Sequence, residues 1–317
     1  MKKERVVLVI GIITILISSI ISVYAANYIY NSNEVEYDNT NKNITSTNVQ
    51  GAIDELYVDA NNYSSINTRV TNLETIVTDT AGFHNSVFRG KDITSYYNDG
   101  SLYTRISSGK FTDLYVGDYI IKNGINWRIA GFDIYLGKGD TALTTHHAVI
   151  VPDTKLTTAR MNASNTTEGG YVGSEMYTTT LPNVLTTYIT PVFGTHVLEY
   201  RNLLTTGMSS TLTNRYGSAS GSSNNWTWQT RKLDLMNENQ VGGSIVWSSS
   251  GYETGSDNTQ FPLFRLAPEY IQKERYWYWL RNVTHASCFA DVSSDGHSDH
   301  GKASYTSGGI KPYFYID

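Results

Sequence analysis

Few of the residues that mark common protein classes are present in this chain. A single cysteine, Cys288, in 317 residues excludes an intrachain disulfide framework and any zinc site built from several cysteines. Charged residues make up only 17% of the chain, and the formal net charge of −5 argues against binding to nucleic acid. Phosphate-binding loops, dinucleotide fingerprints and the G-x-S-x-G elbow of serine hydrolases are also missing. We therefore expect neither a cofactor nor a nucleic-acid partner.

Aromatic residues, by contrast, are abundant. The chain has 24 Tyr, 9 Phe and 6 Trp, and its 40% of hydrophobic residues is enough for a packed core and excludes wholesale disorder. Tyrosine combined with Ser, Thr, Asn and Gly is typical of binding surfaces, where rigid rings supply contact area and small polar groups supply hydrogen bonds. The composition therefore favours a binding function.

The first 26 residues have the pattern of a membrane-targeting segment. A basic head, Met1–Arg5, precedes Val6–Val23, an 18-residue stretch without a charge that is near the lower length limit for a membrane-spanning helix. The basic side should stay cytoplasmic, so the pattern predicts a transmembrane anchor with the rest of the chain on the extracellular face. The alternative is a cleaved signal peptide, with Val23–Ala25 as the cleavage region and a secreted product. We favour the anchor because the apolar run exceeds a usual signal core.

Residues 27–82 are predicted to form a linker and a helical stalk. Thr47 and Asn48 are the candidate helix caps, and apolar residues then recur in steps of three and four, with one phase slip near Tyr63. The seam predicts a short stalk that makes the protein a homo-oligomer, and the alternative is one amphipathic helix packed on its own domain. The seam residues that motivate the stalk are Leu56, Tyr63, Ile66, Val70, Leu73 and Val77.

From Phe83 onward the pattern changes to short strands separated by turns. Turn residues occur at Lys122–Gly124 and Gly137–Asp140, and Ser218–Asn225 is predicted to be a flexible loop. We expect residues 83–317 to form one α+β domain with small antiparallel sheets. The predicted strands are Tyr115–Ile121, Asn126–Phe132, His147–Val151 and Ser244–Trp247, and the predicted helices are Leu181–Ile189 and Val197–Leu204.

Two aromatic strands frame the C-terminal part of this domain. Alternation along Tyr276–Arg281 places Trp277 and Trp279 on one face, with bulky residues also on the other, which predicts a central strand. Gly308–Ile316 is the second aromatic strand. Between them, Asn282–Thr306 consists mainly of small polar residues, so two rigid strands support a polar surface.

These strands carry a resemblance to a known family. The pattern W-x-W-L-R, followed by G-I-K-P-x-F-x-I, resembles the end of a C-type-lectin-like domain, whose fold is related to that of the formylglycine-generating enzyme. The resemblance implies such a domain over residues 83–317. Earlier stretches that fit the same family are Glu168–Tyr171, Ser174–Tyr177 and Trp247–Tyr252. Separately, Glu36–Thr40 with Thr47–Leu56 resembles a connector found in bacterial and phage tail or surface proteins.

Some members of that family are the variable proteins of diversity-generating retroelements, whose C-terminal segment is rewritten to display many binding surfaces. The resemblance therefore implies a surface-displayed protein that binds a protein or carbohydrate ligand through a variable polar face. We predict that this face consists of Thr284, His285, Ser287, Asp291, Ser293, Asp295, His297, Asp299, His300, Ser304 and Tyr305. Tyr305 is the expected anchor, because it offers contact area and a hydroxyl at low entropy cost.

Other residues suggest different chemistry. His297–His300 matches no strong metal motif, so we favour a polar surface there and expect no metal. Asp234, Asn237 and Glu238 carry the oxygen groups that calcium prefers, although a surface helix end is the favoured interpretation. His146–His147 is interpreted as a turn pair. The alternative function is an exported enzyme of the formylglycine-generating-enzyme-like fold, with metal assistance as one option, but Cys288 alone cannot supply that family's two-cysteine site.

Overall fold

The computed structural model describes residues 2–30, 36, 38, 40, 43–78, 80–213, 220–248 and 259–317. The chain divides into two compact units, Met1–Thr75 and Ile76–Asp317. The domain boundaries expected after residues 26 and 82 stay predictions. Parts of three sequence features lie outside the described residues: positions 37 and 39 of the connector, 218–219 of the expected loop, and 249–252 of the Trp247–Tyr252 motif.

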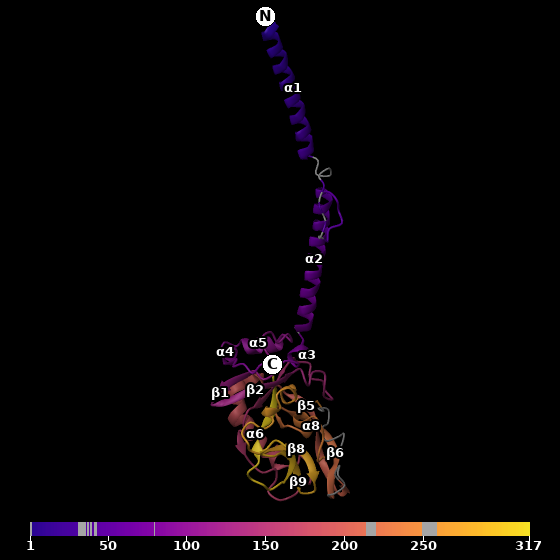
Figure 1. The fold of residues 1–317 in the computed structure, drawn as a ribbon. Helices are drawn as coiled ribbons and strands as arrows, with labels where there is room; N and C mark the ends of the chain where they lie inside the picture. Colours follow the sequence, from indigo (N-terminus) through magenta and orange to yellow (C-terminus); the bar gives the residue numbers. More distant parts are fainter. Residues whose placement is uncertain are drawn as a thin grey trace. The chain divides into compact units, whose positions relative to one another are not determined.

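The N-terminal unit contains α1, Lys2–Tyr30, and most of α2, Val49–Thr78 (Figure 1). Within the described residues, no helix is both long enough and apolar enough to span a bilayer. A spanning helix needs about 20 predominantly apolar residues. This finding contradicts the predicted transmembrane helix and the membrane-anchored location that depended on it, whereas the membrane partner stays a prediction.

Helix α2 begins where the sequence predicts. Asn48 is the cap, because its Oδ1 accepts a hydrogen bond from the backbone N–H of Gly51 at 2.7 Å. The Glu55 carboxylate accepts from the backbone N–H groups of Thr45 and Ser46, which fastens the preceding segment to the helix. The seam residues are exposed, at 73% for Tyr63 and 60% for Leu73. The side chain of Val77 lies outside the described residues, and homo-oligomerisation stays a prediction.

The C-terminal unit is mixed α+β, with several small sheets and short helices. Its strands are β1 Tyr119–Lys122, β2 Ile125–Phe132, β3 Ala148–Pro152, β4 Thr157–Thr158, β5 Tyr200–Thr213, β6 Ser220–Arg231, β7 Asp234–Leu235, β8 Tyr278–His285, β9 Cys288–Val292, β10 Ser298–Lys302, β11 Gly309–Ile310 and β12 Pro312–Ile316. Its α-helices are α3 Ala81–His84, α4 Thr94–Asn98, α5 Ser101–Ser107, α6 Leu181–Val184, α7 Thr190–Phe193, α8 Glu238–Gly242 and α9 Pro262–Leu266. Helical turns of other types cover Met176–Thr180, Leu185–Ile189, Gly194–His196 and Pro268–Tyr270.

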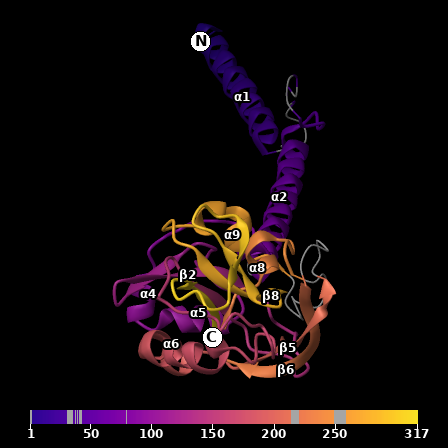
Figure 2. The ribbon, with the colours of Figure 1, turned by 90° about the horizontal axis from the view of Figure 1, so that it is seen from below.

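Two five-stranded sheets organise this unit. The first has the order β1-β2-β3-β12-β7 and the second the order β10-β9-β8-β11-β4. The long hairpin β5–β6 packs beside β8, and α4 and α5 lie together near β1 (Figures 1 and 2). Because β11 and β12 are separated by one residue, Lys311, the chain passes directly from the second sheet to the first. Burial of Lys311 lowers the pKa of its amine to about 8, and this amine donates to the Tyr270 carbonyl at 3.0 Å.

Aromatic rings fill the core between these elements. Trp127, Trp279 and Phe314 are each fully buried, and Trp127 contacts the Phe314 ring edge to face at 5.8 Å. Strand β12 lies within the predicted second aromatic strand and is buried along its whole length. The first aromatic strand is also central, since β8 lies between β9 and β11. These buried strands fix the position of the polar segment that joins them.

Several predicted elements differ from the structure. The first predicted strand starts only at Tyr119, because Gly117 has a φ of 88° and turns the chain. Val197–Leu204 is not helical but leads into β5, and residues 220–225 of the expected loop belong to β6. Ser244–Trp247 forms no strand. Helical structure at Leu181–Ile189, and strands over Asn126–Phe132 and most of His147–Val151, are confirmed.

Candidate binding pocket

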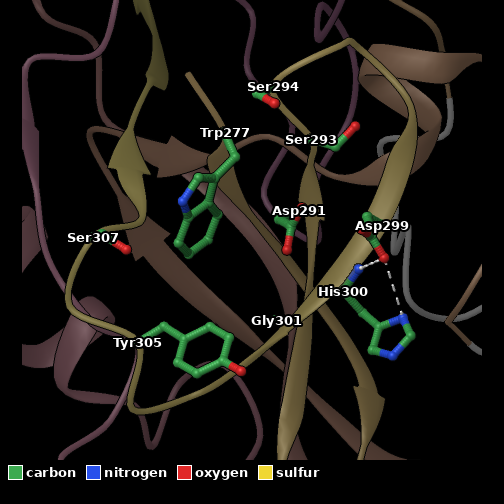
Figure 3. A pocket seen from close by; sticks show the side chains of 9 residues that line it. All are labelled: Trp277, Asp291, Ser293, Ser294, Asp299, His300, Gly301, Tyr305 and Ser307. Atoms are coloured by element: carbon green, nitrogen blue, oxygen red, sulfur yellow. Dashed lines mark hydrogen bonds and ion pairs between the residues drawn. The ribbon is translucent and has the colours of Figure 1, made fainter. Parts of the chain in front are cut away.

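One face of the second sheet carries an open pocket. Asp291 on β9 is the Cα partner of Trp279 on β8 and of Asp299 on β10, so three adjacent strands contribute to the same face. The pocket has a volume of about 460 Å³. It is lined by Trp277, Asp291, Ser293, Ser294, Asp299, His300, Gly301, Tyr305 and Ser307 (Figure 3).

Aromatic rings form the apolar side of this pocket. The indole of Trp277 contacts that of Trp279 edge to face at 4.8 Å, and Trp279 is fixed by donating from Nε1 to the Ala159 carbonyl at 2.9 Å. Tyr305 lies 6.5 Å from Trp277 between ring centroids and is 48% exposed. Gly301 keeps this face open, because a Cβ there would lie 2.9 Å from the Trp279 ring and 3.1 Å from the Asp291 carboxyl.

Asp291 is the polar centre of the pocket. Its side chain points into the space framed by Trp277, Asp299 and Tyr305 (Figure 3). The residue is only 5% exposed, yet its carboxyl makes no hydrogen bond or ion pair with the part of the chain that the structure describes. Burial raises the pKa of Asp291 to about 7, and the negative charge of Asp299 adds to the effect. The pocket thus presents a desolvated carboxyl that has no partner among the residues described.

The opposite face of the same strands holds a second buried carboxylate, in a different setting. Glu238 is 2% exposed and accepts hydrogen bonds from the backbone N–H groups of Trp247 and Ser248 and from the hydroxyls of Ser248 and Ser298, at 2.7–3.1 Å. The His300 ring contacts those of Trp247 and His285 in tilted arrangements, with ring centroids 4.5 Å apart in each pair. Burial, followed by the neighbouring His300, lowers the pKa of His285. The Glu238 carboxylate is thus fully hydrogen-bonded, although it also lines a smaller pocket of about 280 Å³ on this side.

The eleven predicted face residues do not stay together. Five of them line the pocket: Asp291, Ser293, Asp299, His300 and Tyr305. Asp295 and His297 pair with each other at 3.0 Å in the turn between β9 and β10, and Ser304 donates to Asn165 at 2.7 Å. The His285 ring lies tilted against that of His300, and Ser287 is half-buried beside Cys288.

Thr284 departs furthest from the predicted exposed face. It is fully buried and donates its hydroxyl to the Cys288 carbonyl at 3.1 Å. Its position on a binding surface is therefore wrong, because β8 continues through it as a buried central strand.

The sequence reasoning missed four lining residues: Trp277, Ser294, Gly301 and Ser307. The missed signal for Trp277 was its predicted alternation with Trp279, which placed both rings on one face. That pattern assigned Trp277 to the scaffold, whereas the ring is half-buried and stands at the pocket. Gly301 could not be recognised from its side chain, since its role in the pocket is to leave room where a side chain would otherwise lie.

The calcium candidates are structural residues. Asp234, Asn237 and Glu238 are all buried, so their interpretation as a surface helix end is wrong. Asp234 accepts hydrogen bonds from Tyr171, Tyr200, Asn202 and Arg231, and Asn237 caps α8 through a capping box with Gln240.

No metal centre forms among the residues described here, where no three His, Cys, Asp or Glu side chains are grouped to hold an ion. His146 pairs with Asp133 at 2.7 Å, while the buried His147 accepts from the Tyr135 N–H at 3.1 Å. Burial raises the pKa of the Cys288 thiol, which disfavours its reactive thiolate form.

Comparison with known proteins adds no relative. No protein-family model matches the sequence, and neither the curated proteins nor the solved structures give a match.

Proposed function

We propose that the Ile76–Asp317 unit is a ligand-binding module and that the pocket over β8, β9 and β10 is its binding site. The observation that carries this proposal is the Asp291 carboxyl, which is 5% exposed, without a partner in the described part of the chain, and directed into an open pocket. The C-type-lectin-like fold family and the protein or carbohydrate ligand expected from the sequence are parts of the same proposal.

Burial of a polar group is costly unless the group is hydrogen-bonded, and a buried charge costs more. The chain meets this requirement at Glu238 and Asp234, each of which accepts four hydrogen bonds. It does not meet it at Asp291. A ligand that donates to this carboxyl while covering Trp277 and Tyr305 would offset the cost of burying the carboxyl. The same hydrogen bond would hold the ligand in the pocket.

The pocket also separates fixed residues from replaceable ones. Trp279 is fully buried, whereas Ser294, Asp299, Tyr305 and Ser307 are exposed at the rim. Exposed side chains can be exchanged with little effect on folding, while the ring beneath them cannot. This division supports the proposal, implied by the retroelement resemblance, that the rim varies between related proteins.

A blocking substitution tests the proposal. The full chain is screened by ligand-observed NMR against a panel of soluble amines, sugars, alcohols and carboxylic acids. We expect pocket ligands to bind the parent chain, to be lost in Ser307→Trp, whose ring fills the pocket, and to be retained in Ser107→Trp. Ser107 is exposed at the end of α5 and lies outside the pocket lining. A panel without binders, or binding that survives the blocking ring, would contradict the proposal.

An enzymatic function is the second candidate, and one observation favours it. A carboxyl with a pKa of about 7, as at Asp291, is suited to general acid–base catalysis near neutral pH. This candidate predicts that a member of the panel is chemically converted by the parent chain and not by Asp291→Asn. Binding without conversion would leave the module as a binder only.

A further inference from the structure

We propose that the group which the pocket takes is an alkylammonium, whose positive charge pairs with Asp291 while its alkyl arm lies against Trp277 and Tyr305. This inference rests on the pocket being the binding site, as proposed above. It adds the charge and the shape of the ligand, which the binding proposal leaves open.

The charge follows from what surrounds the pocket. Asp291 and Asp299 are Cα partners on adjacent strands, so both carboxyls belong to one face, and the negative charge of Asp299 acts on Asp291. Among the described lining residues there is no Lys or Arg. Lys302, the nearest one along β10, is the Cα partner of Cys288 and lies outside the lining. The site therefore favours a cation and repels an anion.

The shape follows from the aromatic side. Trp277 and Tyr305 stand edge to face, so a guest in the pocket that lies against them meets ring surface, and ring faces attract ammonium groups. The volume of about 460 Å³ admits an ammonium group with a short arm. A neutral sugar could also stack on the rings, but it would leave the repulsion between the two carboxyls uncompensated. A cation removes that repulsion, which is why we favour it.

The titratable groups near Asp291 predict how binding depends on pH. They are Asp299 and His300 on β10, Tyr305 in the following loop, and Cys288 on its own strand, while Trp279 on β8 does not titrate. A cation favours the charged form of Asp291 and so lowers its pKa from about 7. Binding should therefore release a proton near pH 7, and affinity should rise by about tenfold between pH 6 and pH 8.

The test is calorimetry on the full chain with named probes. n-Pentylammonium is compared with pentan-1-ol, which has the same shape without the charge, and with methyl β-glucoside. N-acetyl-lysine methylamide carries the same ammonium on a peptide, so it tests whether the pocket accepts a lysine side chain as well as a free amine. Titrations at pH 6 and pH 8, in two buffers of different ionisation enthalpy, give the affinity and the protons released.

We expect both ammonium probes to bind at least tenfold more tightly than the alcohol, with proton release. Asp291→Asn should abolish this preference, Trp277→Ala should weaken binding, and Glu269→Gln should change nothing, since Glu269 is an exposed carboxylate outside the pocket lining. If the alcohol or the glucoside binds as well as the amine, or the affinity does not change with pH, the inference fails. In that case, loss of the neutral ligand in Ser307→Trp would still support the binding function. If no probe binds and the screening panel is also silent, both proposals fail.

Discussion

The two faces of the β8–β9–β10 sheet each bury a carboxyl, and they treat it in opposite ways. Glu238 is 2% exposed and accepts four hydrogen bonds, whereas Asp291 is 5% exposed and accepts none within the described chain. Equal burial therefore does not mean equal roles. A fully hydrogen-bonded carboxylate links strands and loops, while an unpaired carboxyl at an open pocket is available to bind another molecule.

The largest effect is expected at Trp279, which lies under the Asp291 face. Trp279→Ala should destabilise the unit by about 3–5 kcal/mol, because the ring is fully buried and its removal leaves a cavity. Urea unfolding followed by circular dichroism measures the change. A loss below about 1 kcal/mol, as expected of surface substitutions, would show that this face does not depend on the ring.

The next effect is expected on the Glu238 face. Glu238→Gln should cost about 2–3 kcal/mol, because the new amide nitrogen cannot accept from the hydroxyl and N–H donors that converge there. It should leave binding at the opposite pocket intact in the folded protein. Urea unfolding gives the first quantity, and the panel of probes the second. If Glu238→Gln is as stable as the parent chain, the contrast between the two faces is not real.

Asp291→Asn should have the opposite effect on stability and make the folded protein more stable. Because burial raises the pKa of Asp291 from 3.8 to about 7, the parent chain loses stability as pH rises through this range. Asparagine carries no charge and escapes that loss. The variant should therefore match the parent near pH 4 and exceed it by roughly 1–3 kcal/mol at pH 8, after allowance for water in the open pocket. Urea midpoints across this range measure the difference, and a stability advantage that shrinks as pH rises would refute it.

The smallest effect is expected at the pocket rim. Replacing Ser294, Tyr305 and Ser307 together by alanine should change the stability by less than about 1 kcal/mol, because these side chains are exposed. The same replacement should weaken ligand capture through the loss of the Tyr305 ring. Thermal unfolding and calorimetry on one sample separate the two. Melting of the fold would show that the rim is structural.

Local sequence signals predicted the parts of the fold that they control. The start of α2 follows from the Asn48 cap, and the turn between β1 and β2 follows from Asn123–Gly124, whose φ angles of 54° and 75° suit those two residues. The two aromatic strands were recognisable because their bulky residues exceed what a surface can hold. Each of these signals is carried by neighbours in the sequence.

The missed parts depend on distant residues. Polar residues 220–225 read as a loop, yet they pair with β5 and become strand. Glu238 reads as a surface residue until Trp247, Ser248 and Ser298 bring their donors to it from other parts of the chain. The same holds for the pocket, where alternation placed Trp277 beside Trp279 but could not say that this face stays open. Which strands pair, and which faces of a sheet are covered by other elements, are properties of the tertiary structure.

Main-chain hydrogen bonds help to fix the polar segment between the aromatic strands. Ser293 donates its backbone N–H to the His297 carbonyl, Ala303 to that of Ser287, and Gly309 to that of Trp277, at 2.9–3.1 Å. Hydrogen bonds of this kind are indifferent to side-chain identity, so the course of the segment is inherited whatever residues its exposed positions carry. We therefore expect the rim to tolerate many different side chains without loss of the fold, so that substitutions at the rim alone can change which ligand is bound.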